Sequence, residues 1–141
     1  EEYQVKVCDF NLSKLMDSDS ARSSSIAAMN PRWLANEILG GAKPDQSADV
    51  FAFGVILWEI LTWEMPWAAH NPWTIVSGVM SGQRLSIPPV EHLPGPDNAR
   101  FGGIEEYVAL VQRCWDQDKE ARPQFPEICA DLRRLLADLE I

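Results

Sequence analysis

The pattern of apolar and polar positions predicts helices over most of the second two thirds of the chain. Residues 49–63 are apolar on nearly every side, which is typical of a helix in the middle of a core. Residues 72–81 fit a shorter helix that stops at Gly82. Residues 104–115 are amphipathic, and 123–139 carry one apolar side. The apolar positions of these last two are Ile104, Val108, Val111 and Trp115, then Ile128, Leu132, Leu135, Leu136 and Leu139.

Signals for helix ends accompany this pattern. Ser47 or Asp49 can cap the start of the central helix by accepting backbone N–H groups. Pro66 lies just beyond the predicted end of that helix. Pro126 would fall in the first turn of the last helix, where a missing N–H group costs little. These residues therefore support two of the predicted helices.

The remaining segments predict one short strand and two long loops. Tyr3–Cys8 alternates apolar and polar residues and predicts a strand. Residues 12–30 are rich in serine, aspartate and alanine and have no apolar face, so they predict a loop. Residues 88–103 form a proline- and glycine-rich loop, either a docking insert or a tolerated insertion. The expected fold class is mainly α (α+β), in one domain.

Composition narrows the classes of partner. The chain has 141 residues, 46% of them hydrophobic, and a formal net charge of -9. This charge argues against nucleic acid or an anionic membrane surface as the main partner. The apolar run Val50–Trp58 is far shorter than the roughly 20 residues of a membrane span. Cys8, Cys114 and Cys129 are far apart, which favours reduced, partly buried thiols and a cytoplasmic location.

Four short segments carry candidate chemistry. In the first, Asp9 follows the predicted strand and precedes Phe10, and a carboxylate there can hold Mg²⁺ against phosphates. An aspartate after a strand is also an ordinary turn former, so this segment alone is weak evidence. The other three are NPRWLANE at 30–37, SADVFAFGVILWE at 47–59 and CWDQDKEARP at 114–123.

In order and spacing these segments resemble the Asp-Phe-Gly motif, the Ala-Pro-Glu motif, the central hydrophobic helix and the late Arg-Pro of eukaryotic protein kinases. They are most similar to the tyrosine-kinase-like, Raf-like group of plants and algae. The resemblance covers Val5 to Leu139. It implies a partial kinase domain over 1–141: an activation segment at 9–37 and the C-terminal helical lobe at 38–141. It also implies an ATP- and Mg²⁺-dependent serine/threonine kinase that phosphorylates protein substrates in signalling.

The resemblance assigns roles at the nucleotide side. Asp9 resembles the Mg²⁺ ligand that orients the phosphates of ATP, which makes it the expected catalytic and metal-binding residue. Phe10 resembles the packing residue that separates active from inactive arrangements. Cys8 would face the nucleotide cavity, where it is either an alkylation site or a buried, inert thiol.

The resemblance also assigns structural roles. Glu37 and Arg122 resemble a buried ion pair that ties the end of the activation segment to the last helices. Asp49 resembles a helix-start carboxylate that accepts backbone N–H groups of the catalytic loop. Residues 29–32 resemble the loop that receives the substrate residue after the phosphorylated one, and Trp33 is expected to pack under it. Trp58 and Trp115 are expected in the core.

The serine-rich stretch resembles a phosphorylated activation loop. Arg22 lies among these serines, and phosphate there could order the loop by pairing with a basic cluster. The alternative is a loop that is simply solvated. The candidate phosphorylation sites are Ser18, Ser20, Ser23, Ser24 and Ser25.

Two departures from the family pattern leave a second function open. Asn11 replaces a glycine and tolerates its left-handed geometry. Asn36 replaces a proline, and we expect it to loosen a turn without abolishing the Glu37 contact. No Gly-rich loop, strand lysine or His-Arg-Asp loop occurs among these residues, so we expect the chain alone to be inactive and little stabilised by Mg²⁺-ATP. The alternatives are a catalytically inactive kinase-like interaction module and a helical domain with chance motifs.

Overall fold

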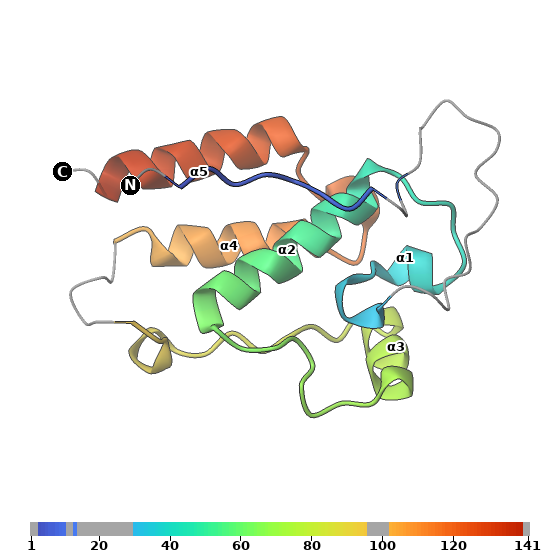
Figure 1. Ribbon diagram of the computed structural model, residues 1–141. Coiled ribbons are helices and arrows are strands. Elements are labelled where there is room, and N and C mark those ends of the chain that lie inside the picture. The colour runs from blue at the N-terminus through green and yellow to red at the C-terminus, as the bar shows by residue number, and fades with distance from the viewer. Residues whose placement is uncertain (1–2, 11–12, 14–29, 96–101, 140–141) are drawn as a thin grey trace.

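Helix α2 (Gln46–Thr62) is the central element of the computed structural model, which describes residues 3–10, 13, 30–95 and 102–139. It packs closely against α4 (Ile104–Cys114), and α4 in turn packs against α5 (Phe125–Leu139). Figure 1 shows α4 and α5 running alongside each other with α2 crossing the domain, while α1 and α3 lie toward one end. The four helices predicted from the pattern are all present, and the mainly α fold is confirmed.

The ends of α2 differ slightly from the predicted ones. Its cap is Asp45, whose side chain accepts a hydrogen bond from the backbone N–H of Ser47 at 2.9 Å. The prediction of Ser47 or Asp49 as the cap was therefore wrong, because both lie inside the first turn. At the other end Trp63 takes a left-handed conformation (φ 59°), and its N–H bonds to the carbonyl of Glu59.

Shorter elements surround α2. A single 3-10 turn, η2 (Pro31–Trp33), leads into α1 (Asn36–Leu39), and both pack against α3 (Pro72–Met80). The 3-10 turns η3 (Val90–His92) and η5 (Lys119–Ala121) precede α4 and α5 respectively. Pro126 lies in the first turn of α5, as the sequence predicts.

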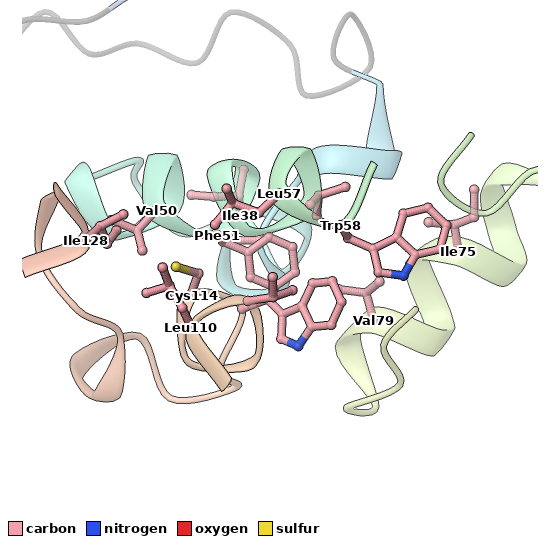
Figure 2. Close-up of a cluster of buried hydrophobic side chains, with 14 residues drawn as sticks. Ile38, Val50, Phe51, Leu57, Trp58, Ile75, Val79, Leu110, Cys114 and Ile128 are labelled. Carbon is pink, nitrogen blue, oxygen red and sulfur yellow. The ribbon is translucent and has the colours of Figure 1, made fainter. Parts of the chain in front are cut away.

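The core lies where α2, α3 and α4 meet. Phe51, Trp58 and Val111 are at most 4% exposed, and Trp115 is 5% exposed, so both expected core tryptophans are confirmed. Figure 2 shows the buried side chains converging from these helices, with the Cys114 sulfur beside Val50 and Leu110. The Trp58 indole N–H is satisfied by the carbonyl of Ser86 at 2.9 Å.

The close approach of α2 and α4 depends on Gly54. A Cβ atom at this position would lie 2.7 Å from the Cβ of Cys114. Cys114 is fully buried, and burial raises the pKa of its thiol to about 11. This cysteine is therefore a packing residue in its protonated form.

The N-terminal segment, residues 3–10, has no regular secondary structure. Its apolar side chains are open to solvent, with Tyr3 89%, Val5 96% and Val7 82% exposed. The strand predicted for Tyr3–Cys8 is thus not formed, because a strand requires a neighbour for its backbone groups and no described residue provides one. Cys8 and Cys129 are exposed, so the expectation of three partly buried thiols holds only for Cys114.

Candidate functional site

A buried ion pair joins α1 to the segment before α5. The Arg122 guanidinium donates to both carboxylate oxygens of Glu37 at 2.8 Å, in a bidentate arrangement. The Arg122 side chain is completely buried, while the Glu37 side chain is 15% exposed. A paired carboxylate in this geometry gives a strong, directional contact. The two residues that the sequence analysis paired thus lie together, although they are far apart in the chain.

The remaining donors of Arg122 are also satisfied. Its Nε donates to the carbonyl of Asp116 at 2.9 Å, and one terminal nitrogen donates to the carbonyl of Ser47 at 3.1 Å. The guanidinium lies over the Phe51 ring, 5.1 Å from its centroid. Burial is the largest single influence on Glu37 and opposes its ionisation, but the hydrogen bond from Arg122, a backbone hydrogen bond and the Arg122 charge together outweigh it, so the pKa of Glu37 is lowered.

A second arginine lies beside this pair. Arg84 donates from Nε to the carbonyl of Trp115 at 2.7 Å, and its guanidinium lies 5.0 Å from the Phe51 ring centroid. It also donates to the side chain of Gln117 at 2.7 Å. Burial lowers the pKa of Arg84, and the Arg122 charge lowers it further. We call Asn36, Glu37, Arg84, Gln117 and Arg122 the ion-pair junction.

Arg84 and Gln117 were not identified from the sequence. Arg84 lies outside the four motif segments, and Gln117 lies in the fourth at a position that the motif does not specify. The Gln117 side chain connects Arg84 to the carbonyl of Met80 at the end of α3, at 3.0 Å. A polar network between loops has no one-dimensional signature, since it is assembled only when the helices pack.

The start of α2 carries charged groups next to the junction. Asp45 forms an ion pair with Lys119 at 2.7 Å, and this hydrogen bond, with that from Ser47, lowers the pKa of Asp45 to about 2. Asp49 lies one turn further along, where partial burial of its carboxylate and the nearby Asp45 raise its pKa. Both carboxylates line an open hollow of about 710 Å³ together with Lys119 and Phe125. The contact of Asp49 with the backbone of a catalytic loop stays a prediction.

The residues expected on the substrate side lie in or next to η2. The Asn30 side chain accepts a hydrogen bond from the Arg32 N–H at 3.2 Å. The Trp33 indole donates to Glu59 of α2 at 2.8 Å. Trp33 also packs against the buried core. In contrast, the Nε of Arg32 is buried and has no hydrogen-bond partner among the described residues.

The metal-binding candidate lies in the N-terminal segment. Asp9 takes a left-handed conformation (φ 63°), and Phe10 is 66% exposed. The carbonyl of Phe10 accepts a hydrogen bond from the Ser13 N–H at 3.0 Å, which makes a tight turn after the motif. Cys8 is exposed, so its interpretation as a buried thiol was wrong. The segment that carries all three candidates presents them to solvent.

The donor set at Asp9 fits Mg²⁺ in type. Within the described part of the chain, no group of three or more histidine, cysteine, aspartate or glutamate residues could enclose a metal ion. Mg²⁺ usually takes only one or two protein carboxylates and completes its shell with water and phosphate oxygens. One exposed carboxylate is therefore compatible with that ion. The candidate phosphorylation sites Ser18, Ser20, Ser23, Ser24 and Ser25 lie outside the described residues.

An all-round apolar central helix, a buried glutamate–arginine pair at its N-terminal end and flanking amphipathic helices together define the helical lobe of a protein kinase domain. A family model described as protein tyrosine and serine/threonine kinase matches residues 1–132. The chain belongs to this family, and the resemblance inferred from its motifs is confirmed.

Relatives with established names support the same assignment. The chain is 38% identical to the probable serine/threonine-protein kinase SIS8 of Arabidopsis thaliana, over 93% of its own length and 12% of that protein. It is 37% identical to the serine/threonine-protein kinase CTR1 of the same plant, over 96% of the chain and 15% of the relative. It is 33% identical to the dual specificity protein kinase shkD of Dictyostelium discoideum, over 98% of the chain and 17% of that protein. The chain therefore spans less than a fifth of the length of these proteins.

Proposed function

We propose that residues 9–37 form the activation segment and residues 38–141 the helical lobe of a cytoplasmic protein kinase that transfers a phosphoryl group from ATP to serine or threonine hydroxyls of protein substrates. The observation that carries this proposal is the bidentate Glu37–Arg122 pair, at the positions where the kinase motifs require it. The names of the plant relatives support the choice of serine and threonine as acceptors. In the described residues, no helix is long and apolar enough to cross a membrane.

In this proposal Asp9 provides an oxygen ligand for Mg²⁺, and Mg²⁺-ATP supplies the phosphoryl group when bound. The ion-pair junction has a different task. It holds α1 in place and, through the short Leu34–Ala35 connection, fixes η2 as the loop that receives the substrate. Trp33 anchors the same loop to Glu59 of α2. Phosphoryl transfer relies on positioning, so rigid support of this loop contributes directly to the rate.

The hydroxyl specificity needs its own assay, because one relative is named a dual specificity kinase. Peptides that carry serine, threonine or tyrosine in the same surroundings would report it. We expect phosphate on serine and threonine and little on tyrosine.

A non-catalytic interaction module is the alternative. Asn11 and Asn36 depart from the family pattern, which favours a domain that has kept the fold and lost the chemistry. The two proposals differ in the chemistry of Asp9: an enzyme needs its carboxylate, and an interaction module does not.

The test is a phosphoryl-transfer assay on the longest natural polypeptide that contains these residues, with labelled ATP, Mg²⁺ and a basic protein substrate. We expect transfer, and we expect Asp9→Asn to reduce it by about 100-fold or more. The matched control is Asp138→Asn, because Asp138 is an exposed carboxylate near the end of α5. Absence of transfer beside an active reference kinase, or full activity of Asp9→Asn, would overturn the catalytic proposal.

A further inference from the structure

Asn36 stands at the first position of α1 and is the residue that replaces the family's proline. Its side-chain oxygen accepts hydrogen bonds from Arg84 at 3.3 Å and from Arg122 at 3.1 Å. Its side-chain nitrogen donates to the carbonyl of Gln117 at 3.1 Å. One amide thus contacts three places in the fold: the loop after α3, the segment after α4, and Arg122 before α5.

The backbone at this position is suited to proline. Ala35 has φ -65° and ψ 150°, the extended conformation that a following proline requires. The first helical residue has no intrahelical partner for its N–H group, and proline is favoured there. The expectation that Asn36 loosens a turn stays a prediction, whereas the Glu37 contact that was expected to survive is present. The contacts of Asn36 that distinguish it from a proline are those of its side chain.

The two arginines need such a side chain. Arg84 and Arg122 both lie over Phe51, at 5.0 and 5.1 Å from its ring centroid, and their like charges repel. Glu37 neutralises Arg122 through a bidentate contact, whereas no carboxylate forms an ion pair with Arg84 within the described residues. The Asn36 oxygen is the acceptor that the two guanidinium groups share. A proline side chain has no polar atom and could accept neither bond.

We infer that Asn36 is a positioning residue: its amide bridges Arg84 and Arg122 and thereby locks α1 against the end of α3 and the segment after α4. The bridge extends the Glu37–Arg122 pair into a network that also includes Gln117 and, through it, the carbonyl of Met80. This inference does not depend on phosphoryl transfer, since all of its contacts lie among described residues. It means that Asn36, which departs from the family's proline, adds hydrogen bonds that a proline could not form.

Two substitutions test the bridge by the unfolding equilibrium of the chain in urea. Asn36→Pro keeps the backbone geometry and removes all three side-chain bonds, and Asn36→Ala removes the bonds alone. Because two of the bonds come from charged donors, we expect each variant to raise the unfolded-to-folded ratio by about tenfold or more. Equal or greater stability of Asn36→Pro would overturn the inference. If that variant does not fold, Asn36→Ala gives the answer.

A spectroscopic measurement separates bridging from a general loss of stability. In nitrogen-15 spectra of the folded chain, we expect Asn36→Ala to shift the terminal guanidinium signals of Arg84 and Arg122 together. Their Nε signals should change less, since these atoms bond to the carbonyls of Trp115 and Asp116. Unchanged terminal signals, or a change at one arginine alone, would contradict the shared bridge.

The control is Asn71→Ala. The Asn71 side chain caps α3 by accepting a bond from the Thr74 N–H at 3.0 Å, and it contacts no arginine in the described chain. Loss of such a cap destabilises a protein by a similar amount. We therefore expect a comparable change in the unfolding equilibrium without movement of the Arg84 and Arg122 signals. Movement of these signals in the control as well would refute the assignment to Asn36.

Discussion

The ion-pair junction and the N-terminal segment both carry kinase motifs, and they differ in how far the described chain organises them. At the junction, the whole Arg122 residue, backbone included, is only 6% exposed. Its guanidinium is held by a carboxylate, an amide and two carbonyls. In the N-terminal segment, Val5 is 96% exposed and Phe10 66%. The junction draws its partners from four regions of the helical lobe. The N-terminal segment has the residues of its motif, but their side chains stay exposed among the described residues.

The difference has a simple physical origin. A buried charge is tolerated only when it is paired and hydrogen-bonded, so Arg122 requires its partners as soon as the helices pack. An exposed aspartate such as Asp9 has no such requirement, because water solvates it. The ion-pair junction is therefore organised by the packing of the helices, whereas the packing of the helices does not organise the segment around Asp9. Four predictions test this contrast, from the largest expected effect to the smallest.

Replacement of the buried arginine should have the largest effect. We expect Arg122→Met to lower the free energy of unfolding by about 3–5 kcal/mol, because Glu37 would remain as a largely buried carboxylate without its arginine. Urea denaturation followed by tryptophan fluorescence measures this change. The control is Arg133→Met at an exposed site of α5, expected within about 0.5 kcal/mol of the native chain. A loss below about 1 kcal/mol for Arg122→Met would show that the junction is not what holds these segments.

Crowding between α2 and α4 should have the next largest effect. We expect Gly54→Ala to destabilise the fold by about 1–3 kcal/mol, since its Cβ would lie 2.7 Å from the Cβ of Cys114. Thermal unfolding measures it, with Gly40→Ala as the control, because the nearest atom to a Cβ there is 3.4 Å away. Equal effects of the two alanines would mean that the helices can move apart at little cost.

The ion pair at the start of α2 should give a smaller, pH-dependent effect. The hydrogen bond from Lys119 and that from Ser47 lower the pKa of Asp45 from 3.8 to about 2. The ionised form therefore stabilises the fold above about pH 3.8, and this stabilisation is lost as the pH falls toward 2. Asp45→Asn keeps a good helix cap and removes the charge. We expect the free energy of unfolding to fall by about 0.5–1 kcal/mol at neutral pH. Between pH 4 and 2 it should depend less steeply on pH than in the native chain.

The Glu37 pKa is also lowered, so part of the acid dependence should remain in Asp45→Asn. Unfolding curves at a series of pH values measure both contributions. Asp138→Asn, at an exposed site, should leave the pH dependence of the free energy of unfolding between pH 4 and 2 unchanged. An identical pH profile of Asp45→Asn and the native chain would remove the role assigned to the Asp45–Lys119 pair.

The smallest effect should come from the N-terminal segment. We expect Val5→Ser and Phe10→Ser to change the free energy of unfolding of this chain by less than about 0.5 kcal/mol, because both side chains are exposed. Ile75→Ser, at a residue 1% exposed, provides the contrast and should be strongly destabilising. A loss of more than 1 kcal/mol in either N-terminal variant would show that this segment does pack on the helical lobe.

The sequence by itself determined the helices and the pairing at the junction. The all-round apolar segment that became α2 and the apolar side of α5 follow from local spacing, which a one-dimensional pattern contains. Glu37 and Arg122 were paired from motif order. Pro126 correctly marked the first turn of α5, although the cap of α2 proved to be Asp45, one residue before its helix.

Only the tertiary structure decided the network around these residues. Arg84 and Gln117 lie in separate loops and Asn36 lies at the start of α1, so their hydrogen bonds exist only because these segments pack together. The guanidinium groups of Arg84 and Arg122 both lie over the Phe51 ring there. It also decided that Tyr3–Cys8 is not a strand, since strand formation depends on a partner elsewhere in the fold. Local patterns determine elements, whereas polar networks and sheets require residues that are distant in sequence to meet in space.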